Sequence, residues 1–244
     1  MHTLFVSDLH LCSERPDTTA MFLHFLRDTA PQAEALYILG DLFEYWIGDD
    51  DLAAPFHGEI AQALAQLAAS GVRVYLLHGN RDFLIGPAFA QAAGLCLLEE
   101  PSLVDLYGVP TLLSHGDTLC SDDVDYQNFR AMVRDPAWQQ SFLAKPLAQR
   151  KALIEQWRGK SEEEKKYKEA AIMDVNSDSV AAILREYGYP RLIHGHTHRP
   201  ARHLHSVDGH NCERWVLPDW NGDGGYLRCD RDGCAAVAIP TLTA

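Results

Sequence analysis

The stretch Leu-Ile-His-Gly-His-Thr-His, at residues 192–198, joins an apolar run to a glycine and two further histidines. This pattern predicts a buried strand that opens into a tight loop. His196 and His198 are one residue apart, and on an extended backbone two such side chains point the same way. Imidazole is a common metal ligand near neutral pH, so the loop is a candidate for metal binding. Taken alone, however, such a pair is more often two surface histidines.

Four other apolar runs end in ligand-type residues, namely those at residues 2–7, 35–39, 72–77 and 109–114. In layered α/β domains, ligands bind at the carboxyl ends of the strands. The seven candidate ligands are Asp8, His10, Asp41, Asn80, His115, His196 and His198. Two ions that share a bridging carboxylate would use them all. Their oxygen and imidazole donors suit two Mn²⁺ ions, with Fe²⁺ or another divalent ion such as Zn²⁺ as the alternative.

The order of the apolar patterns predicts one layered α/β domain over residues 1–244. Helical patterns separate the first strands, and residues 124–171 form a helical insertion. The insertion is basic, because residues 130–168 hold ten Lys or Arg against five Asp or Glu. The C-terminal part alternates like strands, with turns at residues 208–209 and 232–233, and we expect antiparallel strands that close a second sheet.

The composition excludes several classes of protein. The net charge of −13 argues against a nucleic-acid partner, which favours a basic surface. No apolar run is long enough to span a bilayer, and we expect no targeting peptide because the first residues form a strand. The six cysteines contain no Cys-x-x-Cys pair, so we expect reduced thiols in a cytosolic protein.

The five strand ends together resemble the motifs of the calcineurin-like metallophosphoesterases: Asp8-x-His10, Gly40-Asp41, Gly79-Asn80, His115-Gly116 and Gly195-His196-x-His198. The resemblance implies a four-layer α/β/β/α sandwich with a dinuclear site between the strand ends. It places Asp8, His10, Asp41 and His198 on one ion. It places Asp41, Asn80, His115 and His196 on the other, so that Asp41 bridges the two. A hydroxide held between the ions would attack phosphorus.

The third motif departs from the family pattern, in which a histidine follows Gly-Asn. Here Arg81 stands in that place. Arginine does not release its proton near neutral pH, but it can hold a phosphate with two hydrogen bonds. A phosphate leaving group, whose second pKa is about 6, hardly needs a proton. Arg81 therefore favours a phosphoanhydride substrate, unless it merely pairs with Asp82 or another carboxylate.

Residues 40–49, 79–84 and 115–123 are similar to those of the family members that act on UDP-2,3-diacylglucosamine in lipid A biosynthesis. The similarity implies that metal-activated water attacks the α-phosphorus and yields UMP and 2,3-diacylglucosamine 1-phosphate (lipid X). The residues that it places in catalysis are Asp41, Asn80, Arg81, His115 and His196. Alternatives are another dinuclear phosphoesterase acting on soluble nucleotides or phosphodiesters, a binding module with structural metals and, least favoured, a DNA nuclease.

The insertion offers basic and apolar side chains that suit an acylated, anionic substrate. Gly159 could end one helix, and Ser161 with Glu164 could cap the next. By resemblance, the substrate would contact Asn80, Arg81, Asp123, Arg158, Ser161, Lys165, Lys168 and His196. Alternatively, Ser161 is only a cap and the lysines form a solvated face.

Amphipathic patterning of the insertion also permits reversible contact with an anionic lipid surface. We therefore expect a peripheral protein on the cytoplasmic side of the inner membrane, monomeric and without nucleic acid. Trp138, Phe142 and Trp157 could instead only pack the insertion onto the domain. Three adjacent carboxylates at residues 49–51 are interpreted as a solvated loop rather than ligands. Asp82, Asp117 and His194 are expected to orient the ligands.

Overall fold

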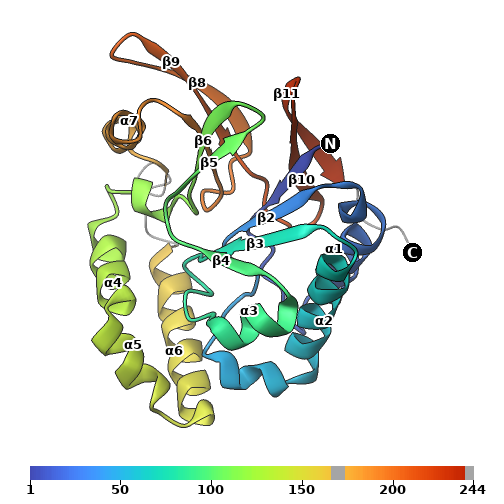
Figure 1. Cartoon of the computed structure of the whole chain (residues 1–244). Coiled ribbons are helices and arrows are strands. Elements are labelled where there is room, and N and C mark those ends of the chain that lie inside the picture. Colours follow the sequence, from blue (N-terminus) through green and yellow to red (C-terminus); the bar gives the residue numbers. More distant parts are fainter. Residues whose placement is uncertain (166–173, 240–244) are drawn as a thin grey trace.

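The computed structural model describes residues 1–165 and 174–239, with the backbone alone for residues 158–165. Two sheets pack face to face, with helices on both outer sides (Figure 1). This confirms the predicted α/β/β/α layering. A buried apolar cluster between the sheets includes Phe5, Leu39, Leu77, Leu113 and Ile193, so five of the loop-bearing strands share one core.

The first sheet has six strands in the order β11-β10-β1-β2-β3-β4. Their bounds are β1 Thr3–Val6, β2 Ala35–Leu39, β3 Arg73–Leu77, β4 Cys96–Leu98, β10 Gly224–Asp230 and β11 Gly233–Ile239. β1 to β4 are parallel, so their carboxyl ends meet at one edge. Helices α1 Pro16–Asp28, α2 Pro55–Ala69 and α3 Pro87–Ala93 cover the outer face. Each of them begins with a proline, whose fixed φ suits the first helical position.

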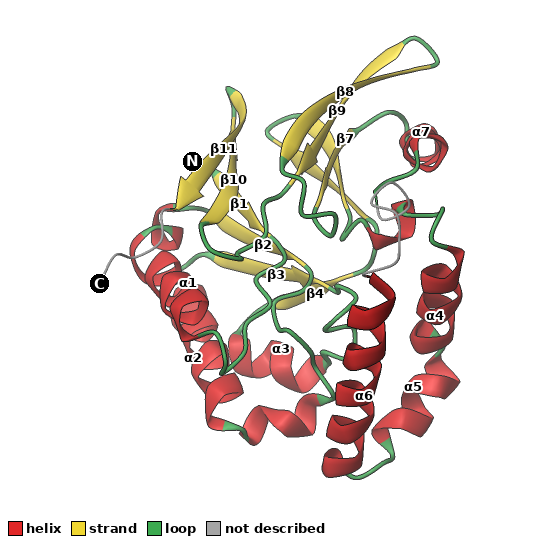
Figure 2. Cartoon of the chain, turned by 180° about the vertical axis from the view of Figure 1, so that it is seen from behind, coloured by secondary structure: helices red, strands yellow, loops and turns green. Residues whose placement is uncertain are grey.

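The second sheet has five strands in the order β5-β6-β7-β9-β8. Their bounds are β5 Ser102–Leu106, β6 Val109–Leu113, β7 Arg191–His194, β8 Ala201–Val207 and β9 His210–Val216. Helix α7 Ser177–Glu186 packs on its outer side through Val180 and Leu184 (Figure 2). Because β6 and β7 are parallel, the loops after them open at the same end of the sheet.

The prediction that the C-terminal strands close the second sheet is wrong for the last hairpin. β10 pairs with β1, with Thr3 opposite Cys229, so β10 and β11 extend the first sheet. Only the hairpin of β8 and β9 belongs to the second sheet. The turn residues determine that each hairpin forms, whereas the free edge that it meets depends on contacts far apart in the sequence.

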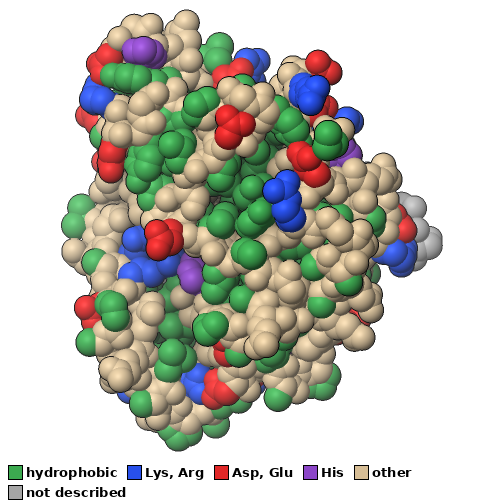
Figure 3. Space-filling model, in the orientation of Figure 1, with side chains coloured by type: hydrophobic (Ala, Val, Ile, Leu, Met, Phe, Trp, Pro, Cys, Tyr) green, Lys and Arg blue, Asp and Glu red, His purple; other side chains and the backbone are tan. Residues whose placement is uncertain are grey.

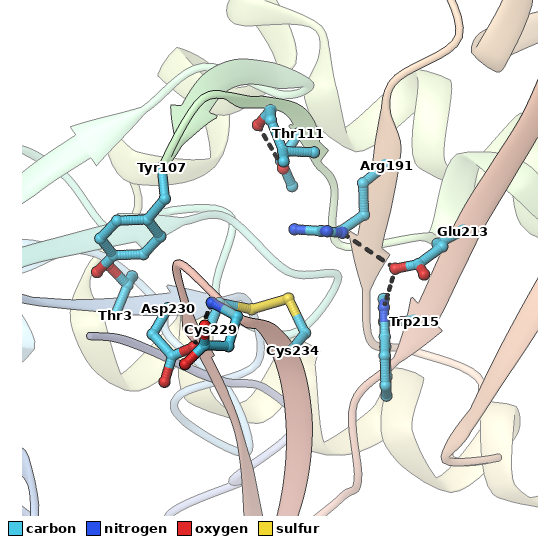
Figure 4. Close-up of a disulfide and its surroundings, with 11 residues drawn as sticks. Thr3, Tyr107, Thr111, Arg191, Glu213, Trp215, Cys229, Asp230 and Cys234 are labelled. Atoms are coloured by element: carbon cyan, nitrogen blue, oxygen red, sulfur yellow. Dashed lines mark hydrogen bonds and ion pairs between the residues drawn. A yellow bond between two sulfur atoms is a disulfide. The ribbon is translucent and has the colours of Figure 1, made fainter. Parts of the chain in front are cut away.

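The expectation of six reduced thiols is also wrong for two of them. Cys229 and Cys234 lie opposite each other on β10 and β11 and form a disulfide (Figure 4). The other four cysteines are not part of a disulfide. The hairpin register explains the pair, because a turn centred between residues 230 and 233 brings the two side chains together.

Three helices follow the His115-Gly116 motif after β6: α4 Val124–Arg134, α5 Pro136–Leu143 and α6 Leu147–Lys165. α6 runs through Gly159 and Ser161, so the predicted helix break there is wrong. A glycine costs about 1 kcal/mol in a helix, which good helix formers around it offset. The predicted end of the insertion, near residue 171, lies outside the described residues, and the division of the chain stays a prediction.

The insertion is attached through both apolar and charged contacts. Trp138, Phe142 and Trp157 pack against one another, with ring centroids 5.0 to 5.9 Å apart. The buried guanidinium of Arg150 donates to the carbonyl of Ile47 and pairs with Asp50. α6 is therefore fixed to the loop that follows β2.

Candidate dinuclear metal centre

The five predicted loops meet where the two sheets face each other. Five of the ligand-type residues have positive φ angles between 49° and 67°, a conformation that is rare outside glycine: Asp8, His10, Asp41, His196 and His198. Strained backbone of this kind collects at functional sites, because the surrounding structure must hold it there. The strained backbone therefore indicates that these loops form a functional site.

Three ligand-type residues form what we call the first half-site: Asp8, His10 and His198. Their donor atoms lie within 4.8 Å of one another. Asp8 Oδ1 is 3.4 Å from Nε2 of His198 and 3.9 Å from Nε2 of His10. Spacings of this size leave room for an ion among the donors.

The second half-site consists of Asn80, His115 and His196. Nε2 of His115 and Nδ1 of His196 lie 2.8 and 2.9 Å from Asn80 Oδ1. Asp41 stands between the half-sites, because its Oδ2 is 3.8 Å from Nε2 of both His10 and His115. The structure thus brings all seven predicted ligands together, with Asp41 in the bridging place.

The donor atoms themselves indicate a cation. Asp8 Oδ1 and both ring nitrogens of His10 are buried and have no hydrogen-bond partner among the described residues. Buried polar atoms are rarely left without a partner, and a divalent ion would satisfy Asp8 Oδ1 and Nε2 of His10, while Nδ1 of His10 faces Glu44 at 3.5 Å. The residues present therefore fit two divalent ions bound through oxygen and imidazole nitrogen.

The crowding of charge shifts the pKa values of the ligands. Burial raises the pKa of Asp41 to about 7, and the neighbouring Asp82 adds to the rise. For His115, burial opposes the charge, but Asp41 and Asp8 prevail and raise the pKa to about 9. Burial lowers the pKa of His10 to about 3. Neighbouring imidazoles thus favour opposite protonation states, as expected where donors converge on a site for positive charge.

The backbone of the loops is held by Asp82, as predicted for a supporting residue. Its buried carboxylate accepts hydrogen bonds from the backbone N–H groups of Asp41, Leu42 and Gly79, at 3.3, 2.7 and 2.8 Å. Gly79 also permits the close approach of the two loops, because a Cβ there would lie 2.1 Å from Asp41 Oδ1. The carboxylate therefore fixes two ligand loops at once.

Two carboxylates that the sequence reasoning missed contact the outer nitrogens of the histidines. Glu44 lies 3.5 Å from Nδ1 of His10 and pairs with Arg15, and Asp219 lies 3.4 Å from Nδ1 of His198. A carboxylate in this place orients the ring and makes it a better ligand. The position of Glu44 inside the motif at residues 40–49 could have marked it as a functional residue, whereas no sequence motif surrounds Asp219.

His194 is also placed as expected. Its Nδ1 donates to the carbonyl of Gly195, and its Nε2 accepts from the buried Arg214 at 3.0 Å. This arrangement supports the loop that carries His196.

The prediction of a solvated loop at residues 49–51 is wrong. Asp49 accepts from the first N–H groups of α3, and Asp51 is buried against Lys151.

Arg81 lines a cavity of about 190 Å³ together with ligands of both half-sites and with Arg15, Glu44, Asp219 and Asn221. Among the described residues, no carboxylate lies within ion-pair distance of the Arg81 side chain, so the alternative of a pair with Asp82 is not supported. The guanidinium is therefore available to a ligand in the cavity.

The remaining predicted substrate residues are placed less completely. Asp123 caps α4, accepting from the N–H of Tyr126 at 3.1 Å. The side chains of Arg158, Ser161 and Lys165, and the whole of Lys168, lie outside the described residues. Their roles stay predictions.

Comparison with known proteins places the chain in a family. The calcineurin-like phosphoesterase model matches residues 1–200. A UDP-2,3-diacylglucosamine hydrolase from Aromatoleum aromaticum is 57% identical over 233 residues, which cover 96% of this chain and 95% of the relative. Another, from Cellvibrio japonicus, is 50% identical over 96% of this chain and 98% of the relative. The chain belongs to the calcineurin-like phosphoesterase family, together with these UDP-2,3-diacylglucosamine hydrolases.

Proposed function

We propose that this chain hydrolyses the pyrophosphate bond of UDP-2,3-diacylglucosamine, giving UMP and 2,3-diacylglucosamine 1-phosphate. Relatives named UDP-2,3-diacylglucosamine hydrolase match this chain over nearly the full length of both chains. In the geometry, the observation that carries the proposal is Arg81, whose guanidinium lines the cavity beside both half-sites. A fixed positive charge next to a dinuclear site suits a substrate with two adjacent phosphates.

The residues divide the work of the reaction. Asp8, His10, Asp41 and His198 would hold one ion, and Asp41, Asn80, His115 and His196 the other. Bound divalent ions supply a polarised water and positive charge opposite the phosphoryl oxygens. Asp82 holds the backbone of Asp41 and Gly79, so the ligands need not rearrange during the reaction. Arg81 would hold the leaving phosphate, which departs without a proton from the enzyme.

We propose Mn²⁺ as the ion in both half-sites, with Fe²⁺ or another divalent ion as the alternative. The donors are carboxylate oxygens, one amide oxygen and imidazole nitrogens, a set that suits these ions. Metal analysis of protein purified without added metal, followed by activity titrations with each ion, tests this assignment. Activity that is equal with every divalent ion would contradict the preference for manganese.

We also propose that the chain works as a monomer on the cytoplasmic surface of the inner membrane. Its substrate carries two acyl chains, and Phe129, Met132 and Leu143 of the insertion are exposed. Within the described part of the chain, no helix is both long and apolar enough to cross a bilayer. Flotation with anionic vesicles at low salt tests the membrane contact, and light scattering tests the monomer.

A comparison of two substrates separates this function from that of a soluble-nucleotide phosphoesterase. Initial rates would be measured on UDP-2,3-diacylglucosamine in mixed micelles and on UDP-glucosamine without acyl chains, both with Mn²⁺. The proposal predicts hydrolysis of the acylated substrate alone, and its loss on chelation. Equal turnover of both substrates would support the alternative function.

A further inference from the structure

Helix α4 presents three side chains in one row toward the metal centre. Tyr126, Arg130 and Arg134 are spaced four residues apart and therefore lie on the same face of the helix. Each of them donates a hydrogen bond to a segment that carries or flanks a ligand of the second half-site. The row thus connects the insertion to one half of the metal centre.

Arg134 is closest to the ligand Asn80. Its Nη2 donates to the carbonyl of Gly79 at 2.9 Å, one residue before Asn80. The same guanidinium lies over the ring of Phe83, 5.5 Å from its centroid. The loop that carries Asn80 is therefore held by two side chains: Asp82 accepts from the N–H of Gly79, and Arg134 of the insertion donates to the carbonyl of Gly79.

Arg130 reaches His115 through Glu100. Its Nη2 donates to Glu100 Oε2 at 3.3 Å, while Glu100 Oε1 accepts from the N–H of His115 at 2.8 Å. Nε of Arg130 and the hydroxyl of Tyr126 both donate to Asp117 Oδ2, at 2.8 and 2.6 Å. The Tyr126 ring also lies 5.8 Å from the ring of His196.

The first half-site has no such link. None of the hydrogen bonds that the row makes within the described residues goes to the loops of Asp8, His10 or His198. Those histidines are instead backed by Glu44 and Asp219, which belong to the loop after β2 and to the loop before β10. The row and the two carboxylates thus support different half-sites, and the half-sites meet in the loop at residues 195–198, where the N–H of His196 donates to Asp8 Oδ2 at 2.8 Å.

We propose that Tyr126, Arg130 and Arg134 are positioning residues that set the geometry of the second half-site for the reaction. The inference rests on the proposed function for its substrate, but its effect on metal binding does not. If the row holds Asn80 and His115 in place, its loss weakens one of two metal sites and slows the chemical step. Substrate binding at Arg81 changes little.

The position of the row makes its variants suitable for experiment. Arg130 and Arg134 line a hollow of about 480 Å³ with His78 and Glu100, and Figure 3 shows basic side chains gathered beside a histidine between α4 and β4. A shortened side chain there opens onto solvent instead of leaving a sealed void. The variants should therefore fold.

The test is a Mn²⁺ titration by calorimetry on metal-free wild type, Arg134→Ala, Arg134→Lys, Tyr126→Phe and the control Asn128→Ala, an exposed residue of the same helix. We expect Arg134→Ala to weaken one site by about 10- to 100-fold and leave the other unchanged. Lys at this position, which can still donate to the Gly79 carbonyl, should restore most of the affinity. Tyr126→Phe should show a smaller loss at the same site.

Kinetics with UDP-2,3-diacylglucosamine give the second readout. Arg134→Ala should lower kcat at saturating Mn²⁺ with little change in KM, and the control should match the wild type. Equal weakening of both sites together with a lowered Tm would overturn the inference, as would unchanged metal affinity and kcat. If the wild type binds two ions but leaves this substrate intact, the proposed function fails, and the titration still decides the role of the row.

Discussion

The two halves of the metal centre differ in how they are held and in how open they are. The His198 side chain in the first half-site is 41% exposed, whereas His115 in the second is fully buried. The first half-site relies on carboxylates behind its histidines, whereas the second relies on the carbonyl of Leu39, which accepts from Nδ1 of His115 at 2.9 Å, and on the row on α4. The difference indicates that the first half-site is the more accessible to water, whereas the second is enclosed by the segments that support it. Asp41 is the residue that both halves share.

The largest effect is expected where the halves meet. Asp41→Asn keeps the shape of the side chain but removes the bridging charge, so we expect kcat/KM to fall on the order of 10³-fold or more. The metal-free variant should be at least as stable as the wild type at pH 8. Burial raises the pKa of Asp41 to about 7 in the folded protein. The wild type therefore loses stability as the pH rises from the pKa of Asp41 in the unfolded chain through 7, because the buried carboxyl group must lose its proton. Steady-state kinetics and thermal unfolding measure the two effects.

Asp28→Asn, on the exposed end of α1, is the matched control for this prediction and should change neither quantity. An Asp41→Asn protein that is active, or that fails to fold without metal, would contradict a bridging catalytic role. The second result would support a binding module in which the metals are structural.

Arg81 belongs to the loop of the second half-site but lines the cavity with His10 of the first. We expect Arg81→Ala to lower kcat/KM on UDP-2,3-diacylglucosamine by roughly 100-fold, because two hydrogen bonds to phosphate are lost. Arg81→Lys should recover only part, since an ammonium cannot make both bonds. A phosphodiester with an activated leaving group should be much less affected. Equal losses on both substrates would argue that Arg81 supports the fold.

The carboxylates behind the first half-site should act on that half alone. Glu44→Gln and Asp219→Asn remove the charge behind His10 and His198, so each should weaken one Mn²⁺ site by about 10- to 100-fold. Calorimetry on these variants beside Arg134→Ala compares the halves directly. We expect the double variant Asp219→Asn/Arg134→Ala to weaken both sites. If Asp219→Asn and Arg134→Ala weaken the same site, the comparison of two separately held halves is wrong.

The smallest effect per step is that of pH, about tenfold for each unit. In the metal-free protein, the pKa of His115 is about 9 and that of His198 about 10, because the nearby carboxylates outweigh the burial that opposes their charge. Both rings are therefore protonated at pH 7, and an ion must displace a proton from each. The dissociation constant for Mn²⁺ should fall by about tenfold per unit of pH for each proton released, from pH 7 toward 9. Affinity that is independent of pH would contradict these protonation states.

The sequence predicts the seven convergent residues because each lies directly after an apolar run, and carboxyl ends of adjacent strands share an edge. It also predicts the helical insertion and both C-terminal hairpins. It does not predict the supporting roles of Asp219, Glu100 and Arg134, because the partners of these residues are distant in sequence. The partner of Arg134 is, in addition, a backbone carbonyl, which no sequence pattern marks. The carboxylates at residues 49–51 resemble a solvated run until the structure places α3 and α6 beside them.

The same limit explains the two corrections at the C-terminus. Local turn residues predict that β10 and β11 pair, but the open edge of β1 is a property of the assembled sheet. Once the register is known, Cys229 and Cys234 must face each other, and a spacing of five residues around a Gly-containing turn was the available signal. Local patterns here thus predict that a hairpin forms but not which sheet edge it joins, and the helix break expected at Gly159 shows that even a local pattern can fail.

The central claim is that this site directs water to the α-phosphorus of a nucleotide-linked lipid. The most direct test is ³¹P NMR of UDP-2,3-diacylglucosamine hydrolysis in mixed micelles, with the protein, Mn²⁺ and water enriched in ¹⁸O. We predict that the isotope shift appears in the phosphate of UMP and that the sugar 1-phosphate carries none. Label in the sugar 1-phosphate, or an intact anhydride with protein that still cleaves an activated phosphodiester, would contradict the account.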